Sequence, residues 1–149
     1  MNTQGRYSHL IVREPKPVGT LPHHESDEGK PIPGVFLMSG SQVVEANACV
    51  ICVFWKSIPR QVAANVDKLP RAVPHKHDSD EIYIMLGDVG GITFEITLGD
   101  EQYVVDTPAC VYLPRGIAHS VRVLRAREGA TAGLIPVLLQ PNYSTLPVD

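Results

Sequence analysis

Short apolar runs separated by glycine and proline turns dominate the second half of the chain. Residues 92–98 alternate apolar and polar side chains without a break, as a strand with one buried face does. Gly99-Asp100 supplies a turn, and residues 101–105 return as the second strand of a hairpin. Further strands are expected at 109–113, 120–124 and 132–139. So many short strands predict an all-β sandwich or barrel.

Three local features refine this prediction. Helical periodicity is confined to residues 59–68. Pro136 interrupts the run at 132–139, and a proline inside a strand is expected at a sheet edge or a bulge. The apolar run 48–55 resembles a buried strand and carries Cys49 and Cys52, whose spacing places them on opposite faces. We therefore expect these two cysteines, and Cys110, to be buried free thiols rather than a redox or zinc motif.

The first 34 residues differ from the rest in composition. They are rich in proline, glycine and charge, which predicts an extended arm (1–34) before a single β domain (35–149). A short apolar piece at 9–12 can pair as an edge strand. Because exposed sheet edges need covering, we expect the arm to lie along a neighbouring subunit and to support a homodimer.

Size and charge exclude several function classes. The chain has 149 residues, enough for one domain with its own core, and a formal net charge of −3 with both signs interspersed. No basic segment suggests nucleic-acid binding. No apolar stretch is long enough to span a membrane. The first residues lack the pattern of a secretory signal, so we expect a cytoplasmic location.

The segment from Pro74 to Tyr83 contains a candidate metal site. His75 and His77 are two residues apart, so on a strand both rings project from one face. Glu81 follows a polar turn, and an inward-facing register at 75, 77, 81, 83 and 85 lets the two imidazoles and the carboxylate converge. His119 follows a Pro-Arg-Gly turn and begins the next strand, where it can supply a fourth donor. A histidine pair alone also occurs by chance on protein surfaces, but the joint pattern indicates a divalent first-row metal.

These residues resemble the two motifs of the cupin superfamily. His75, His77 and Glu81 match the ligands of the first motif, and Pro114, Gly116 and His119 match the second. Four scaffold positions depart from the pattern: Leu69 and Pro108 stand where glycines are usual, Gly87 comes one residue early, and Val123 replaces an asparagine. The stretch from Pro74 to Glu81 also resembles a group of uncharacterised small bacterial cupins. The resemblance implies a cupin-type β-barrel (double-stranded β-helix or jelly roll).

The resemblance implies three functions. The first is a mononuclear enzyme, with Fe(II) preferred and Mn, Ni, Zn or Cu as alternatives, that oxidises a small organic molecule with dioxygen. The second keeps the metal as a Lewis acid in an isomerase, lyase or polyketide-cyclase type of reaction. The third is a non-catalytic small-molecule-binding module. The presence of all four ligands and the absence of a DNA-binding segment favour an enzyme.

Residues near the ligands suggest further roles. Tyr83 is a candidate catalytic residue, since its hydroxyl can orient a substrate or donate a proton, although it can equally be a core tyrosine. Arg115 is a second candidate that can clamp a substrate carboxylate, or be a solvated turn residue. Val121, Val123 and the strand at 92–98, through Phe94 and Ile96, are expected to make the cavity apolar. His9, His23 and His24, in the arm, are expected to be solvated.

Overall fold

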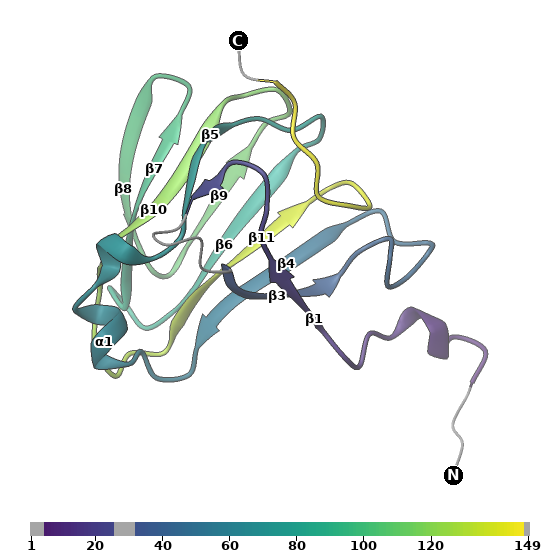
Figure 1. The fold of residues 1–149 in the computed structure, drawn as a ribbon, viewed down its shortest axis with the longest axis horizontal. Coiled ribbons are helices and arrows are strands. Elements are labelled where there is room, and N and C mark those ends of the chain that lie inside the picture. Colours follow the sequence, from purple (N-terminus) through teal and green to yellow (C-terminus); the bar gives the residue numbers. More distant parts are fainter. Residues whose placement is uncertain (1–4, 26–31, 148–149) are drawn as a thin grey trace.

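Two antiparallel sheets form the protein in a computed structural model that describes residues 5–25 and 32–147 (Figure 1). The six-stranded sheet has the order β1-β3-β4-β11-β6-β9. Its strands are β1 (Lys16–Gly19), β3 (Ile32–Met38), β4 (Cys49–Trp55), β6 (Glu81–Gly87), β9 (Ala109–Leu113) and β11 (Ala132–Leu138). The all-β prediction is therefore confirmed.

The five-stranded sheet has the order β2-β5-β10-β7-β8. Its strands are β2 (His24–Glu25), β5 (Arg71–His75), β7 (Ile92–Leu98), β8 (Glu101–Asp106) and β10 (His119–Ala126). The predicted hairpin is confirmed, because β7 and β8 pair in unbroken register from Thr93 opposite Asp106 to Leu98 opposite Glu101.

Helical structure is sparse in the described residues. The short helix α1 (Arg60–Ala63) and the 3-10 turn η3 (Val66–Lys68) fall in the predicted region 59–68. A further 3-10 turn, η1 (Ser8–Leu10), occupies the apolar piece that was expected to pair as a strand. That expectation is wrong, and β1 forms the edge strand instead. None of the described helices is long and apolar enough to cross a membrane.

The core lies between the inner faces of the two sheets. Tyr83 and Met85 of β6 pack there with Ile92, Phe94 and Ile96 of β7, and all five side chains are almost completely buried. The alternation of these residues along their strands is what directs one face of each sheet inward. No strand pairing joins the two sheets within the described residues, so the predicted jelly-roll fold is present as a sandwich whose sheets are not closed into a barrel.

The strand β11 departs from the sequence prediction. Pro136 was expected at an edge or a bulge, but β11 lies in the interior of its sheet between β4 and β6. Its register with β6 is unbroken, and Pro136 lies opposite Tyr83. The ladder to β4 stops after Leu134 and resumes at Val137 in the same register. Pro136 has no backbone N–H to donate, and the sheet accommodates it by losing pairs between β11 and β4 while the pairs between β11 and β6 remain.

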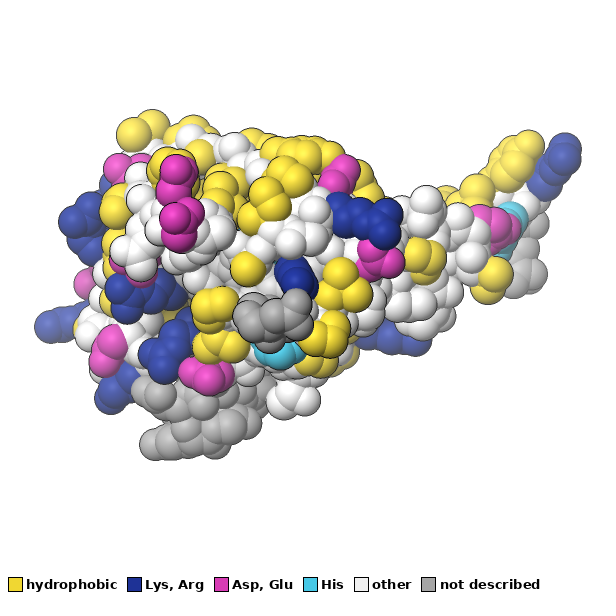
Figure 2. Space-filling view, turned by 90° about the horizontal axis from the view of Figure 1, so that it is seen from above, with side chains coloured by type: hydrophobic (Ala, Val, Ile, Leu, Met, Phe, Trp, Pro, Cys, Tyr) yellow, Lys and Arg dark blue, Asp and Glu magenta, His cyan; other side chains and the backbone are white. Residues whose placement is uncertain are grey.

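The predicted arm contributes strands to both sheets. β1 pairs with β3, and β2 pairs with β5. Residues 1–4 and 26–31 of the arm lie outside the described residues, and β3 begins at Ile32, inside the predicted boundary. The segment before β1 projects from the body of the molecule (Figures 1 and 2). On the face shown in Figure 2, acidic and basic side chains are interspersed.

The cysteines are free, as expected, but only one is fully buried. Cys49 is completely buried, and burial raises its pKa to about 11. Cys52 is half-buried and Cys110 is exposed. The prediction of a buried Cys110 is wrong, because on the edge strand β9 this side chain faces away from the core.

Candidate metal centre

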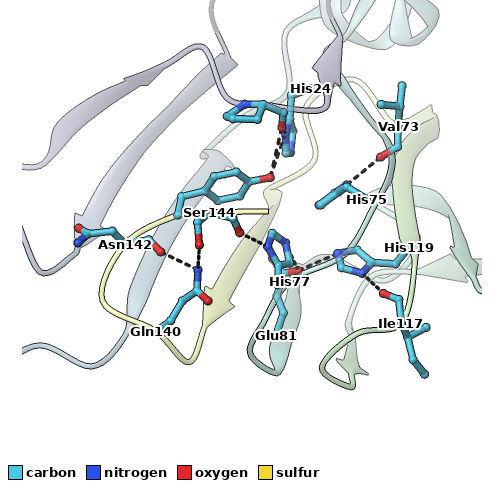
Figure 3. A network of polar contacts seen from close by, with 12 residues as sticks. His24, Val73, His75, His77, Glu81, Ile117, His119, Gln140, Asn142 and Ser144 are labelled. Atoms are coloured by element: carbon cyan, nitrogen blue, oxygen red, sulfur yellow. Dashed lines mark hydrogen bonds and ion pairs between the residues drawn. The ribbon is translucent and has the colours of Figure 1, made fainter. Parts of the chain in front are cut away.

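Four side chains from both sheets meet at one buried point (Figure 3). His75 ends β5 and His119 begins β10, and the two are directly opposite each other in the five-stranded sheet. Glu81 begins β6 in the other sheet, and His77 lies in the connection between β5 and β6. One potential ligand atom from each residue lies within 4.8 Å of all the others. The predicted convergence of these four residues is thus present.

Local chain geometry explains why the two histidines of the first motif share a side. Lys76, between them, forms a bridge with Leu146, and the Leu146 amide donates to the Lys76 carbonyl at 2.8 Å. Because successive side chains of an extended chain alternate, His75 and His77 both point inward. Each has an exposed fraction of 1%.

The turn before His119 is tied to the loop that carries His77. Gly116 has a φ of 78°, which a glycine adopts without strain, and its amide donates to the His77 carbonyl at 3.0 Å. Asp80 accepts a hydrogen bond from the Arg115 amide at 2.8 Å. These contacts hold the two ligand-bearing segments together.

Each of the three imidazoles is oriented by a backbone carbonyl. The Nδ1 atoms of His75, His77 and His119 donate to the carbonyls of Val73 (2.7 Å), Ser144 (2.5 Å) and Ile117 (3.0 Å) respectively. A neutral imidazole that donates from Nδ1 has its lone pair on Nε2. Hydrogen bonds from Nδ1 to a backbone carbonyl fix the tautomer and ring orientation that metal-binding histidines require.

The atoms that face the centre lack partners. The Nε2 atoms of His77 and His119 lie 3.3 and 3.0 Å from Glu81 Oε2, and in the described structure these three buried atoms have no hydrogen-bond partner. Buried lone pairs that face a carboxylate repel it, so a proton or a cation must lie between them. The donor set, three imidazole nitrogens and one carboxylate oxygen, fits a divalent first-row metal.

Protonation states also suit a metal. Burial, together with the neighbouring His119 and His77, lowers the pKa of His75 to about 4, so this ring is neutral at pH 7. Burial raises the pKa of Glu81, but His119 and His77 outweigh that effect and hold it at about 2. Burial lowers the pKa of His77, but Glu81 and the Ser144 carbonyl together raise it above its ordinary value. A proton therefore competes with a metal for the His77–Glu81 pair at low pH.

A largely apolar cavity of about 110 Å³ adjoins the centre. His75, Glu81 and Tyr83 lie at its polar end. As predicted, Val121, Val123 and Phe94 contribute to its wall, whereas Ile96 is buried in the core and is not part of the wall. The full lining comprises Leu21, His24, Ile32, Pro33, Ile51, Val53, Trp55, Leu69, Pro70, Ala72, His75, Glu81, Tyr83, Ile92, Phe94, Val121, Arg122, Val123, Leu134, Pro136 and Tyr143.

Two residues at the polar end were missed from the sequence. His24, expected to be solvated, is half-buried, lines the cavity, and lies with its ring 5.4 Å from that of His75. Tyr143 packs edge-on against His77, with ring centroids 5.3 Å apart, and its hydroxyl is 3.4 Å from His24 Nδ1. Neither residue belongs to a recognisable motif, and the strand pairing of β2 with β5 is what brings His24 here.

The remaining candidates lie elsewhere. Arg115 is exposed and forms an ion pair with Asp78, and it is not part of the cavity wall. Its predicted role as a carboxylate clamp stays a prediction. His9 is exposed and paired with Glu45 at 2.9 Å. His23 is exposed and stacks on His75 with ring centroids 6.0 Å apart.

Comparison with solved structures identifies the fold. A predicted oxalate decarboxylase of Thermotoga maritima superposes with a TM-score of 0.51 at 12% identity, over 83% of this chain and 90% of that one. A cupin-like protein of the same organism gives a TM-score of 0.50 at 15% identity, over 85% and 79%. The chain has a cupin fold. No family model matches the sequence, and no curated protein matches it.

The cupin fold agrees with the position of the candidate centre. The two motif segments that the sequence identified, around His75 and His119, are the ones that the sandwich brings together. This chain is therefore a cupin-fold protein with a candidate metal site built from three histidines and one glutamate.

Proposed function

We propose that this cupin is a metal-dependent enzyme, preferentially a mononuclear Fe(II) dioxygenase, that acts on a small organic molecule in the cavity. One observation carries the proposal: the partnerless Nε2 atoms of His77 and His119 converge on Glu81 Oε2 beside an apolar cavity. A metal site that only stabilised the fold would not need to adjoin such a cavity. Iron(II) held by these ligands would supply the one-electron chemistry that dioxygen requires.

The protein's own residues perform the other tasks. His75, His77, Glu81 and His119 hold the metal, and their backbone contacts preorganise them. Tyr83 is buried beside Glu81, and burial, together with Glu81 and Tyr143, raises the pKa of its hydroxyl well above the usual value. This hydroxyl therefore stays protonated and donates a hydrogen bond to a substrate oxygen. The apolar wall excludes water from the bound molecule.

The same hydroxyl favours a second candidate function. A metal held by the four ligands would act as a Lewis acid, and the protonated Tyr83 would donate a hydrogen bond to a substrate oxygen, as suits an isomerase, lyase or cyclase reaction without oxygen. A binding protein without catalysis remains the third proposal.

Metal analysis separates these functions. Purified protein should contain close to one iron per chain, and the iron-loaded protein should consume dioxygen with one or more compounds from a panel of enols, diols and catechols. Tyr83→Phe should retain the metal and lose activity, which separates substrate binding from metal binding. Zinc or nickel content with anaerobic turnover would favour the non-redox enzyme. Metal uptake without turnover of any compound would favour the binding protein.

A further inference from the structure

The cavity wall changes character along its length. In the six-stranded sheet, Glu81 at the start of β6 pairs with Leu138 of β11. Gly87, six residues further along β6, pairs with Ala132, and Ala132 in turn pairs with Trp55 of β4. Six residues of strand span roughly 20 Å at about 3.3 Å per residue. The cavity therefore extends from the metal ligands at one end towards Trp55 at the other.

Apolar side chains line this path from both sheets. After Tyr83 the wall on the six-stranded sheet comprises Pro136, Ile51, Leu134 and Val53 before it reaches Trp55. The wall on the other sheet consists chiefly of Val121, Val123, Phe94 and Ile92. A ligand that fills this space gains free energy from burial of its own apolar surface.

Three polar side chains that are not candidate metal ligands lie near the metal end. Tyr83, Tyr143 and His24 line the cavity near the ligands. His24 donates from Nδ1 to the Pro22 carbonyl at 2.9 Å, which places the lone pair of the neutral ring on Nε2. Two hydroxyls and one imidazole can thus donate to and accept from an oxygen-bearing head group.

The charges of the wall limit the charge of the ligand. Among the wall residues in the described parts of the chain, Arg122 is the only basic side chain apart from the histidines, and its Nε donates to Glu95 Oε1 at 2.8 Å on the half-exposed side of the sheet. Glu81 cancels one of the two charges of a divalent metal, so the site retains one positive charge. A second anionic group in the ligand would be buried without a counter-ion.

Resting on the proposed function, we propose the substrate class of the site. It is an amphipathic molecule with at most one negative charge, whose adjacent oxygen atoms face the metal centre and whose unbranched or aromatic apolar body extends towards Trp55. A small dianion such as a dicarboxylate does not fit this description.

Linear alkyl hydroxamic acids test this class directly. They present two adjacent oxygens and at most one negative charge, and the alkyl chain length can be varied from acetohydroxamic to octanohydroxamic acid. Trp55 is the only tryptophan of the chain, so its fluorescence reports the far end of the cavity. Binding to the iron- or nickel-loaded protein is measured by calorimetry and by this fluorescence.

We expect affinity to rise about fourfold for each added methylene until the cavity is full, which is the effect of burying one methylene. Only the longer chains should change Trp55 emission. Oxalate should bind more weakly than hexanohydroxamic acid and leave the emission unchanged. Equal affinities for short and long chains, or tighter binding of oxalate, would overturn the inference.

A pair of matched variants tests whether the alkyl chain contacts the cavity wall. Val121→Thr keeps the side-chain shape but adds a hydroxyl to the cavity wall, and it should weaken octanohydroxamic acid severalfold while leaving acetohydroxamic acid unchanged. Val105→Thr is the control, because Val105 is partly buried against the same core but lies outside the wall. Equal effects of the two variants would count against the proposed position of the alkyl chain.

Metal content measured on the same samples distinguishes a failure of the proposed substrate class from a failure of the proposed metal-dependent function. Protein that holds a metal but shows no dependence on chain length overturns this inference and leaves the metal centre intact. Protein that takes up no divalent metal overturns the proposed function and this inference together.

Discussion

At the scale of single residues, the candidate centre depends on backbone carbonyls as much as on its ligands. Val73, Ser144 and Ile117 belong to three different segments, yet each accepts from one ligand imidazole. Ser144 lies 67 residues from His77 in the chain. The C-terminal segment therefore takes part in building the centre, because it fixes the ring that carries one of the nitrogen donors.

Replacement of one ligand should remove the metal. His77→Ala deletes a donor and leaves Glu81 with a single close imidazole, so metal content should fall more than tenfold in protein purified without added metal. Mass spectrometry of wild type and variant measures this. His9→Ala, at an exposed histidine paired with Glu45, is the control and should retain full occupancy. Equal metal content in wild type and His77→Ala would refute the assignment.

At the scale of elements, close contact between β4 and β11 depends on a glycine. A Cβ atom on Gly133 would lie 2.3 Å from the Val53 carbonyl oxygen and 2.7 Å from the Phe54 Cα. Both neighbours are backbone atoms of the paired strand and cannot move independently. The contact explains why a residue without a side chain lies in the interior of the six-stranded sheet.

Gly133→Ala should therefore lower the free energy of unfolding by about 2–3 kcal/mol. The midpoint of urea unfolding measures the change. Gly5→Ala provides the comparison, because a Cβ there would meet nothing within 4 Å, and its midpoint should stay within experimental error of wild type. Similar midpoints for Gly133→Ala and wild type would show that the two strands separate at little cost.

At the scale of the whole molecule, the centre joins the two sheets. His75 and His119 belong to the five-stranded sheet and Glu81 to the six-stranded sheet, so a bound metal links the two layers of the sandwich. Metal binding to the folded state alone must therefore stabilise the fold.

Removal of the metal should lower Tm. At a metal concentration about a thousandfold above Kd the stabilisation is about 4 kcal/mol. For a chain of this length that corresponds to roughly 8–16 °C. Calorimetry with and without a chelator measures the shift. The Tm of His77→Ala should not respond to the chelator, and a wild-type Tm that is equally insensitive would contradict a metal that bridges the sheets.

Exposed apolar residues on the projecting N-terminal segment lead us to propose a homodimer. Tyr7, Leu10 and Ile11 have exposed fractions of 62%, 40% and 54% in that segment. Three apolar side chains on one short segment favour its packing against a second copy. Light scattering should show a dimer for the full chain and a monomer for Ile11→Asp. Val104→Asp, at an exposed valine of β8, is the control, and a monomeric full chain would refute the proposal.

The sequence by itself predicted the parts that depend on local pattern. The alternation of apolar and polar residues predicted the bounds of β7, β8 and β9 to within one residue. Such alternation is a local property, because successive side chains of a strand point to opposite faces. The same rule placed His75 and His77 on one side. The inward-facing register then indicated Glu81 and the turn at residues 114–116 indicated His119, and the resemblance to the two cupin motifs supported both as ligands.

The tertiary structure decided what depends on distant pairing. It placed Pro136 inside a sheet, left the two sheets unjoined, and brought His24 and Tyr143 to the polar end of the cavity. None of these follows from periodicity, because the order of strands in a sheet is set by packing between residues far apart in the chain. Local alternation predicted that His75, His77 and Glu81 face inward, and the sheet order determined which side chains they meet.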